Sequence, residues 1–325
     1  MKSIAGGKLK FKGIGFSNIA LIKYMGKTSH DKNLPSNSSI SLTLPHLHTE
    51  VELESTTGVD RWEPFRDNRK LELNEKGVKR FTDHLKRMKD RYSVSQSFIV
   101  RSANNFPKDS GMASSASSFA ALTLAFGEYL KDQGREILSQ ELAQLSREAS
   151  GSSCRSFFGP FCIWEKSEGR VVAAEIPFKN LKHVALVVSS KAKEVSSSEA
   201  HKRVSTSPLF EGRFQRTEVR MKNLMDAFSK QDWREAYEIT KSEFWDMMGL
   251  FHTSHPSFSY LEPGSIEILN WVDQIWKDLG DGPIVTMDAG PNVHLIFRED
   301  QSEIIKKTEL ELQHFPQVSN FGSEK

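Results

Sequence analysis

The sequence predicts a mixed fold of strands and helices that is divided between two lobes. With 325 residues, the chain is longer than one hydrophobic core usually fills. Apolar and polar residues alternate with the two-residue period of strands mainly before residue 190, whereas longer segments with apolar residues at helical spacing follow it. We therefore expect an N-terminal lobe of residues 1–190 and a C-terminal lobe of residues 191–325.

The overall composition excludes several classes of protein. The chain has 44 Lys and Arg residues against 42 Asp and Glu residues, so it lacks the basic excess of a nucleic-acid binder. No apolar stretch approaches the roughly 20 residues of a membrane-spanning helix, and the N-terminus lacks the apolar segment of a signal peptide. Cys154 and Cys162 are not part of a CxxC motif, which favours a reduced compartment. We expect a cytoplasmic protein that binds neither nucleic acid nor membranes.

The N-terminal lobe begins at residues 9–24 with an alternating pattern that passes through Gly13 and Gly15, which predicts a strand followed by a turn. Turn-forming residues at 33–39 come next. The predicted segments that follow are strands at 40–44 and 49–54, an irregular polar stretch at 58–69, a helix at 77–92, a strand at 97–101, a loop of small polar residues at 104–118, a helix from residue 119 and a helix at 138–148. After a break at 151–156 and an aromatic segment at 157–164, strands are predicted at 170–176 and 183–189.

The C-terminal lobe is dominated by helical periodicity. Helices are predicted at 214–228, 233–251, 265–279 and 302–312. The third of these has the clearest apolar stripe, and Gly280 and Gly282 end it. Residues 284–290 predict a strand that enters a tight turn, with residues 293–297 as its antiparallel partner.

The loop at 104–118 is a candidate phosphate site. Small residues that open a helix expose backbone N–H groups at the positive end of the helix dipole, which suits an anion. The chain has neither a GxxxxGK[ST] P-loop nor a GxGxxG Rossmann motif. From the residues alone, a tightly packed helix start explains the segment equally well.

Three further positions combine charge with a turn. Lys23 and Lys27 flank a short segment and could hold phosphoryl oxygens, although two exposed lysines are the ordinary explanation. Arg155 could grip a carboxylate or phosphate with its planar fork, or simply cap a surface turn. Asp288 ends an apolar run and could serve as a base, or accept hydrogen bonds from turn N–H groups.

Hydrolase and metal-site motifs are missing from the sequence. It contains neither GxSxG nor HExxH, and His252 and His255 lack a recognisable third ligand. We interpret these two histidines as ordinary loop residues.

Taken together and in order, several segments resemble the mevalonate diphosphate decarboxylase family of the GHMP kinase superfamily. The matching segments are 18–27 (NIALIKYMGK), 34–44 (LPSNSSISLTL), 104–107 (NNFP) with 114–116 (SSA), 151–156 (GSSCRS), 286–292 (TMDAGPN), and 195–197 (VSS) with 206–208 (TSP). The resemblance spans most of the chain. It implies an α+β, two-lobed GHMP-kinase-type fold whose N-terminal lobe binds ATP and whose active site lies in the cleft between the lobes.

The reaction that this resemblance implies is ATP-dependent. The 3-hydroxyl of mevalonate 5-diphosphate is phosphorylated, and loss of phosphate and carbon dioxide then gives isopentenyl diphosphate. ATP and Mg²⁺ are the implied cofactors, with Mg²⁺ bridging phosphate oxygens and no protein residue assigned as a metal ligand. The resemblance leaves open whether the chain forms a homodimer.

The resemblance also implies roles for individual residues. Asp288 would act as base or charge stabiliser at the reacting hydroxyl, Lys23 would support it electrostatically, and Arg155 would hold the substrate carboxylate. The remaining implied contacts are Asn18 and Ser153 orienting the substrate, Tyr24, Lys27 and Arg80 gripping its diphosphate, and Asn105, Ser114, Ser115 and Ala116 binding ATP.

The chain departs from the family pattern at three positions. Met25 stands where the family usually has Trp, and Trp245 and Met248 stand where it has a small polar residue and a His. The substrate could therefore differ in shape. The alternatives within the superfamily are a decarboxylase of mevalonate 5-phosphate and a small-molecule kinase that does not decarboxylate. A non-catalytic binding protein is the alternative from another class, and packing alone would not need Lys23, Arg155 and Asp288 together.

Overall fold

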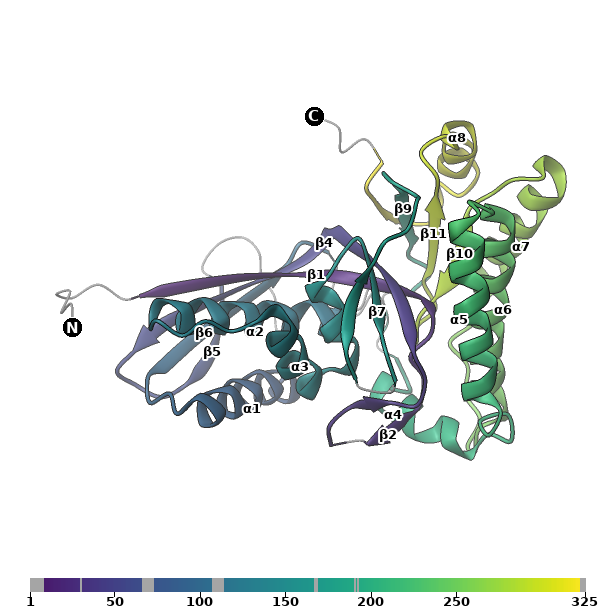
Figure 1. Ribbon diagram of the computed structural model, residues 1–325. Coiled ribbons are helices and arrows are strands. Elements are labelled where there is room, and N and C mark those ends of the chain that lie inside the picture. The colour runs from purple at the N-terminus through teal and green to yellow at the C-terminus, as the bar shows by residue number, and fades with distance from the viewer. Residues whose placement is uncertain are drawn as a thin grey trace.

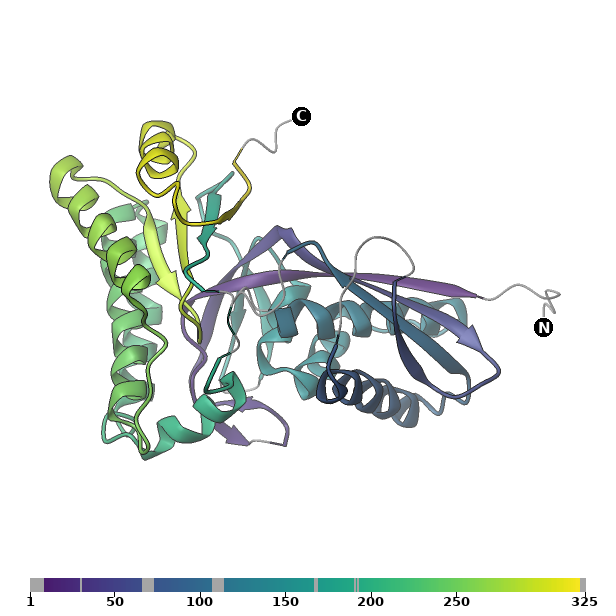
Figure 2. The same cartoon turned by 180° about the vertical axis from the view of Figure 1, so that it is seen from behind.

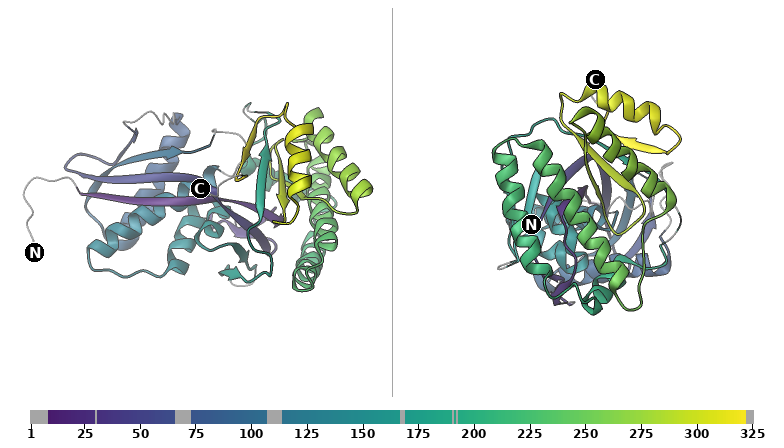
Figure 3. Two further views of the ribbon diagram at one scale, coloured as in Figure 1. Left: turned by 90° about the horizontal axis from the view of Figure 1, so that it is seen from above. Right: turned by 90° about the vertical axis from the view of Figure 1, so that its right-hand side faces the viewer.

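Two main sheets follow one another along the molecule and form the cores of two lobes (Figure 1). The computed structural model describes residues 9–29, 31–65, 73–106, 114–166, 169–189, 191 and 193–321. Seen from behind and from above, β1 runs from the far end of the N-terminal lobe into the C-terminal lobe (Figures 2 and 3). This long strand brings residues of the first lobe against the second.

The N-terminal sheet is built around β1 (Lys10–Ile22) and β4 (Ser39–Thr56), which pair antiparallel from Lys10 to Ile22 with two irregularities in register. Along its other edge, β4 pairs with β6 (Ser97–Asn104) and with β7 (Phe161–Trp164). The outer strands are β5 (Arg61–Pro64), parallel to β6, and β8 (Val171–Ala174), antiparallel to β7. The two strands predicted at 40–44 and 49–54 are thus one strand with a bulge between them, and the stretch predicted to be irregular contains β5.

Three helices, α1 (Glu75–Tyr92), α2 (Ser114–Asp132) and α3 (Ser139–Ala149), lie along this sheet (Figure 1). Glycine in β1 lets α2 approach closely, because a Cβ added to Gly15 would lie 2.1 Å from the carbonyl oxygen of Ser117. The prediction that this helix starts at residue 119 is wrong, since its apolar stripe marks only the buried middle and the small residues before it are already helical. Residues 107–113 of the predicted loop lie outside the described residues.

The C-terminal sheet has the strand order β10–β11–β9–β12 and is antiparallel throughout. Its strands are β9 (Lys182–Leu186), β10 (Ile284–Met287), β11 (Val293–Phe297) and β12 (Gln317–Ser319). The predicted hairpin of residues 284–297 is confirmed. The chain changes sheets between β8 and β9, before the predicted division at residue 190, which itself lies outside the described residues.

Helices complete the second lobe. α5, α6 and α7 stand together on the outer side of the C-terminal sheet (Figure 1). Their bounds are α5 (Arg213–Ser229), α6 (Trp233–Thr253), α7 (Pro263–Leu279) and, beyond β11, α8 (Ser302–Glu311). The short elements are β2 (Lys27–Ser29), β3 (Leu34–Pro35), η1 (Gly151–Phe157), α4 (Ser197–Arg203) and η2 (Val204–Thr206). None of the helices in the described ranges is long and apolar enough to cross a membrane.

The largest hydrophobic core is shared by the two lobes. Ile19, Leu21 and Ile22 from the end of β1 pack in the same cluster as Phe244 of α6 and Met287 of β10. A second core lies between the N-terminal sheet and its helices. Because apolar burial joins the end of β1 to β10 and α6, the residues that follow β1 and β10 are held at the junction of the lobes.

Candidate active site

Lys23 and Asp288 meet at the junction of the lobes. Lys23 follows β1 and Asp288 follows β10, and the Lys23 Nζ lies 2.9 Å from the Asp288 Oδ1. The Lys23 side chain is 2% exposed and that of Asp288 is 28% exposed, so the pair opens to solvent on the carboxylate side. Burial would raise the pKa of Asp288, but Lys23, His294 and Arg155 act against it and hold the pKa below its ordinary value. Burial lowers the pKa of the Lys23 ammonium, and Asp288 opposes that change.

A buried carboxylate fixes the backbone beneath this ion pair. Glu243 of α6 is fully buried, and its Oε1 accepts a hydrogen bond from the backbone N–H of Lys23 at 3.0 Å. Arg213 and Arg220 of α5 pair with the same carboxylate. The side-chain amide of Asn37 donates to the Lys23 carbonyl at 2.8 Å. The turn after β1 is thus fixed from both lobes, which limits where Lys23 can point.

The charge of Arg155 acts on both Lys23 and Asp288, and its side chain is 3% exposed. Its Nε and Nη2 each donate to Asn18 Oδ1 at 3.2 Å, and its Nη1 donates to Ser39 Oγ at 2.8 Å. Asn18 in turn donates to Ser156 Oγ at 2.9 Å. Since a guanidinium carries five N–H groups, these contacts with the described residues leave one N–H on each terminal nitrogen for a ligand.

Three residues expected at a substrate diphosphate lie on the side of α1 and η1. The Tyr24 ring contacts the rings of Trp164 and His201, and its buried hydroxyl has no hydrogen-bond partner among the described residues. The Lys27 ammonium donates to Asn33 Oδ1 at 2.6 Å. Burial lowers the pKa of Lys27, and the charges of Arg80 and Lys202 lower it further, so cations gather here. Arg80 donates to the Ala149 carbonyl at 3.2 Å from its exposed position on α1.

The residues expected to bind ATP occupy the start of α2 and one end of β6. Ser114, Ser115 and Ala116 form the first turn of α2, where backbone N–H groups lack helical partners. The Ser115 hydroxyl lies 3.0 Å from that of Ser150. Asn105 follows β6; its side chain donates to the His46 carbonyl and accepts from the His48 N–H.

The hydroxyl of Ser153, expected to orient the substrate, is fully buried. It accepts a hydrogen bond from the Ser146 hydroxyl at 2.6 Å and donates to the Ser150 carbonyl at 2.6 Å. These contacts tie η1 to the end of α3. Ser153 therefore supports the fold of η1, the segment that also carries Arg155.

The chain matches two family models that together span most of its length. Residues 15–174 match the diphosphomevalonate decarboxylase-like N-terminal domain, and residues 183–323 match the mevalonate 5-diphosphate decarboxylase C-terminal domain. The chain belongs to the diphosphomevalonate decarboxylase family. One similar family member is the diphosphomevalonate decarboxylase of Debaryomyces hansenii, which is 31% identical over 89% of this chain and 79% of that protein. Another is that of Candida albicans, which is 31% identical over 93% of this chain and 87% of that protein.

Solved structures of diphosphomevalonate decarboxylases have the same fold. A mevalonate diphosphate decarboxylase from Legionella pneumophila is 42% identical, with a TM-score of 0.89 over 95% of this chain and 100% of that chain. The Enterococcus faecalis protein is 30% identical, with a TM-score of 0.83 over 96% of both chains. A third structure, a complex with MVAPP, AMPPCP and magnesium, is 32% identical, with a TM-score of 0.84 over 96% of both chains. The predicted two-lobed GHMP-kinase-type fold is thereby confirmed.

The three departures from the diphosphomevalonate decarboxylase pattern lie in different surroundings. Met25 and Met248 are buried in the shared core. Trp245 is 40% exposed on α6 and its ring contacts that of Phe244. The two methionines therefore lie in the packed interior, whereas Trp245 lies on the surface of α6.

Sequence reasoning missed the carboxylate beneath Lys23 and a row of histidines near Asp288. Glu243 lies among the buried, mainly apolar residues of α6, and an acid at such a position is a signal of an internal ion pair. Three histidines, His46, His183 and His294, are far apart in the sequence and gave no such signal. Only the strand pairing brings them together.

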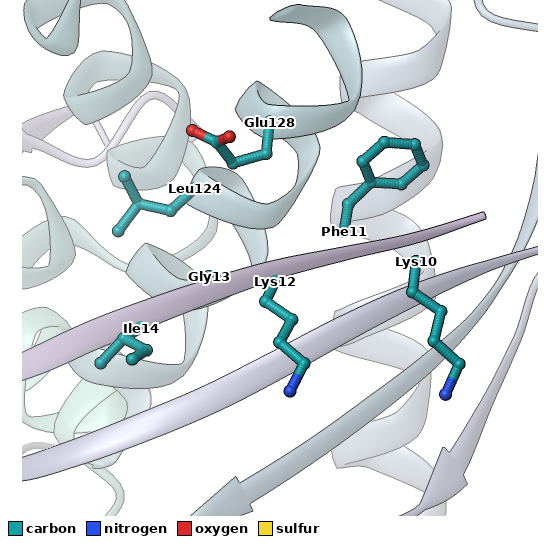
Figure 4. A pocket seen from close by; sticks show the side chains of 7 residues that line it. All are labelled: Lys10, Phe11, Lys12, Gly13, Ile14, Leu124 and Glu128. Atoms are coloured by element: carbon teal, nitrogen blue, oxygen red, sulfur yellow. The ribbon is translucent and has the colours of Figure 1, made fainter. Parts of the chain in front are cut away.

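A surface hollow lies far from this chemistry. Lys10, Phe11, Lys12, Gly13, Ile14, Leu124 and Glu128 line it at the beginning of β1 (Figure 4). Lys23 lies beyond the opposite end of that 13-residue strand. The described residues contain no cluster of three His, Cys, Asp or Glu side chains that could hold a metal ion, and both cysteines are free and buried.

Proposed function

We propose that this chain catalyses the ATP-dependent decarboxylation of mevalonate 5-diphosphate to isopentenyl diphosphate. The observation that carries the proposal is the Lys23–Asp288 ion pair beside Arg155, where the two lobes meet. A carboxylate open to solvent on one side and backed by a buried ammonium suits the activation of an alcohol. The relative that binds MVAPP, AMPPCP and magnesium supports this choice of ligands.

In the first step, the 3-hydroxyl oxygen attacks the terminal phosphorus of ATP. The new O–P bond forms, the bond to the ADP oxygen breaks, and the hydroxyl proton passes to Asp288. Asp288 is ready to accept it, because its lowered pKa keeps it ionised at neutral pH. The Lys23 ammonium is paired with the Asp288 carboxylate. Its positive charge stabilises the negative charge that develops on the reacting hydroxyl oxygen.

In the second step, the carboxylate leaves as carbon dioxide. The electron pair of the broken C–C bond forms the double bond, and the C–O bond to phosphate breaks. Arg155 holds the carboxylate through the two N–H groups that its contacts with Asn18 and Ser39 leave over. Phosphorylation is required because hydroxide is a poor leaving group and phosphate is a good one.

The cationic residues around Tyr24 hold the substrate diphosphate in this proposal, with Lys27 and Arg80 supplying charge. The first turn of α2 holds the ATP phosphates through its backbone N–H groups and the Ser114 and Ser115 hydroxyls. These donors fit ATP with Mg²⁺, since Mg²⁺ is commonly held by phosphates and water with few protein ligands. Mg²⁺ supplies charge neutralisation at the phosphate oxygens. Asn105 and Ser153 contribute by supporting neighbouring segments.

One assay tests the proposal directly. Purified protein is incubated with ATP, Mg²⁺ and either mevalonate, its 5-phosphate or its 5-diphosphate, while ADP and carbon dioxide are followed separately. We expect both products in equal amounts with the 5-diphosphate. ADP without carbon dioxide identifies a kinase, and both products with the 5-phosphate identify the other decarboxylase. The absence of both products contradicts an enzymatic role.

We also propose that the reaction takes place in the cytoplasm. Light scattering in the same buffer tests whether the chain forms a homodimer.

A further inference from the structure

Three histidine rings form a continuous row between the two sheets. His46 Nε2 lies 3.0 Å from His183 Nδ1, and His183 Nε2 lies 2.9 Å from His294 Nδ1. His183 and His294 are each 1% exposed, whereas His46 is only partly buried. The row therefore has one end near solvent and one end in the interior, where His294 Nε2 has no hydrogen-bond partner among the described residues.

Strand register directs the inner end of the row toward the candidate active site. His294 of β11 pairs with Thr286 of β10, and Asp288 lies two residues beyond Thr286. Directly paired residues of neighbouring strands project to the same side of a sheet, so His294 and Thr286 share a side, and the charge of Asp288, the first residue after β10, acts on the His294 ring. Thr286 on that side donates to the Ala20 carbonyl, so this side faces β1 and the Lys23 turn.

The outer end of the row is held by a bulge in β4. Ser17 of β1 pairs with Leu44 and Phe16 pairs with His48, so residues 45–47 have no partners in β1. Asn105 closes this bulge by donating to the His46 carbonyl at 2.7 Å and accepting from the His48 N–H at 2.8 Å. A bulge reorients a side chain relative to a regular strand, and here the His46 ring reaches His183.

Neutral rings in this row can adopt only two mutually consistent arrangements. Each neutral imidazole has one N–H and one bare nitrogen, so all three rings donate in the same direction along the row. In one arrangement the His294 Nε2 is bare, and in the other it carries a proton. The first arrangement becomes the second when a proton is added at His294 Nε2. One proton then moves along each hydrogen bond of the row, and one proton leaves from His46 Nδ1.

The proposed reaction has a use for such a reversible proton path. Phosphorylation of the hydroxyl releases one proton, and the phosphate that leaves in the second step takes one up at neutral pH. The two steps balance within a turnover, but the proton needs somewhere to go between them. We propose that the row of His46, His183 and His294 carries this proton away from Asp288 after the first step and returns it for the second. This inference rests on the proposed function.

Electrostatics favour transfer through neutral rings. Burial lowers the pKa of His46 to about 4 and of His294 to about 4, and it lowers the pKa of His183 well below its ordinary value. The charge of Asp288 raises the pKa of His294, while Lys23 and His46 lower it further. The two flanking histidines lower the pKa of His183 further. No ring is therefore charged for long near pH 7, and the row conducts a proton rather than holding an imidazolium.

The test uses His46→Gln, His183→Gln and His294→Gln in the intact enzyme. Glutamine can donate and accept hydrogen bonds. Unlike an imidazole, however, it does not accept a proton at one nitrogen and release another from a second nitrogen. The control is His84→Gln, which replaces a buried histidine of α1 that bonds Thr123. The measurement is ADP formation in a single turnover with mevalonate 5-diphosphate, with and without added imidazole, together with circular dichroism of each variant.

We expect each row variant to slow the turnover by about 10²-fold, the lower end of general acid–base contributions, and imidazole to restore part of the rate. The control should keep the wild-type rate. Folded row variants with the wild-type rate, or with a reduced rate that imidazole leaves unchanged, would overturn the proposal. If His183→Gln does not fold, the partly exposed His46→Gln decides in the same way. An inactive wild-type enzyme would instead contradict the proposed function itself.

Discussion

At the residue scale, the charge on Asp288 is what separates chemistry from binding. Asp288→Asn keeps the size of the side chain but removes the group that takes the hydroxyl proton, so we expect turnover to fall by about 10²- to 10⁴-fold. ATP affinity, measured by titration calorimetry, should change little. The variant leaves the Lys23 ammonium, which is 2% exposed, without its carboxylate, so some loss of thermal stability is expected as well.

The control for that substitution is Asp300→Asn, whose carboxylate pairs with Arg298 at an exposed position. It should retain full turnover. An Asp288→Asn enzyme that is folded and decarboxylates at the wild-type rate would contradict the assignment, and one that does not fold would show that Asp288 is mainly structural.

Arg155 is the second residue whose shape matters as well as its charge. Arg155→Lys keeps a cation but cannot maintain three bonds to Asn18 and Ser39 and also hold a carboxylate with a planar fork. We expect kcat/KM for the 5-diphosphate to fall by at least about tenfold, the effect of losing one charge-assisted hydrogen bond of about 1.5–3 kcal/mol. Arg61→Lys, at an exposed pair with Glu63, is the matched control. Equal catalytic efficiency in both variants would remove Arg155 from the site.

At the scale of a single element, the beginning of α2 combines a hydroxyl with the positive end of a helix. Ser115→Ala removes one donor to the ATP phosphates, and we expect turnover at saturating ATP to fall by about 10- to 10³-fold, the range for losing one donor to a charged transition state. Ser139→Ala changes an exposed serine at the start of α3 and serves as control. An unchanged rate for Ser115→Ala would mean that the backbone of α2, or another segment, binds the phosphates.

At the scale of the whole molecule, the buried ion pairs of α5 and α6 connect the C-terminal lobe to the end of β1. Glu243→Gln leaves Arg213 and Arg220 with Asp246 alone and weakens the bond to the Lys23 N–H. Removing one partner of a buried pair typically costs about 3–5 kcal/mol, so urea unfolding should show a loss of that size. Because the Lys23 turn is loosened as well, kcat should fall more than ATP affinity.

The matched control is Glu303→Gln, which removes an exposed carboxylate paired with Lys306. Its unfolding curve and kcat should equal those of the wild type. If Glu243→Gln loses stability but keeps its kcat, the carboxylate supports the fold and does not position Lys23.

Most element types could be predicted because they depend on nearby residues. The hairpin at 284–297 and the helices of the second lobe follow from periods of two and about four residues that neighbouring side chains impose. Boundaries were less certain, as α2 shows: Ser114 to Ser118 lack large apolar residues yet are helical, and their turn packs closely against Gly15 of β1 through Ser117. β5 was missed because four residues with little alternation join the sheet through the parallel edge of β6.

The sequence by itself determined the kinds of elements, and its motifs placed Lys23, Arg155 and Asp288 in one family pattern. Only the tertiary structure decided that the ammonium of residue 23 meets a carboxylate 265 positions away. It also placed Glu243 beneath that turn and aligned His46, His183 and His294. The physical reason is that periodicity arises from neighbours along the chain, whereas these contacts arise from strand register and from apolar burial that joins β1 to β10 and α6.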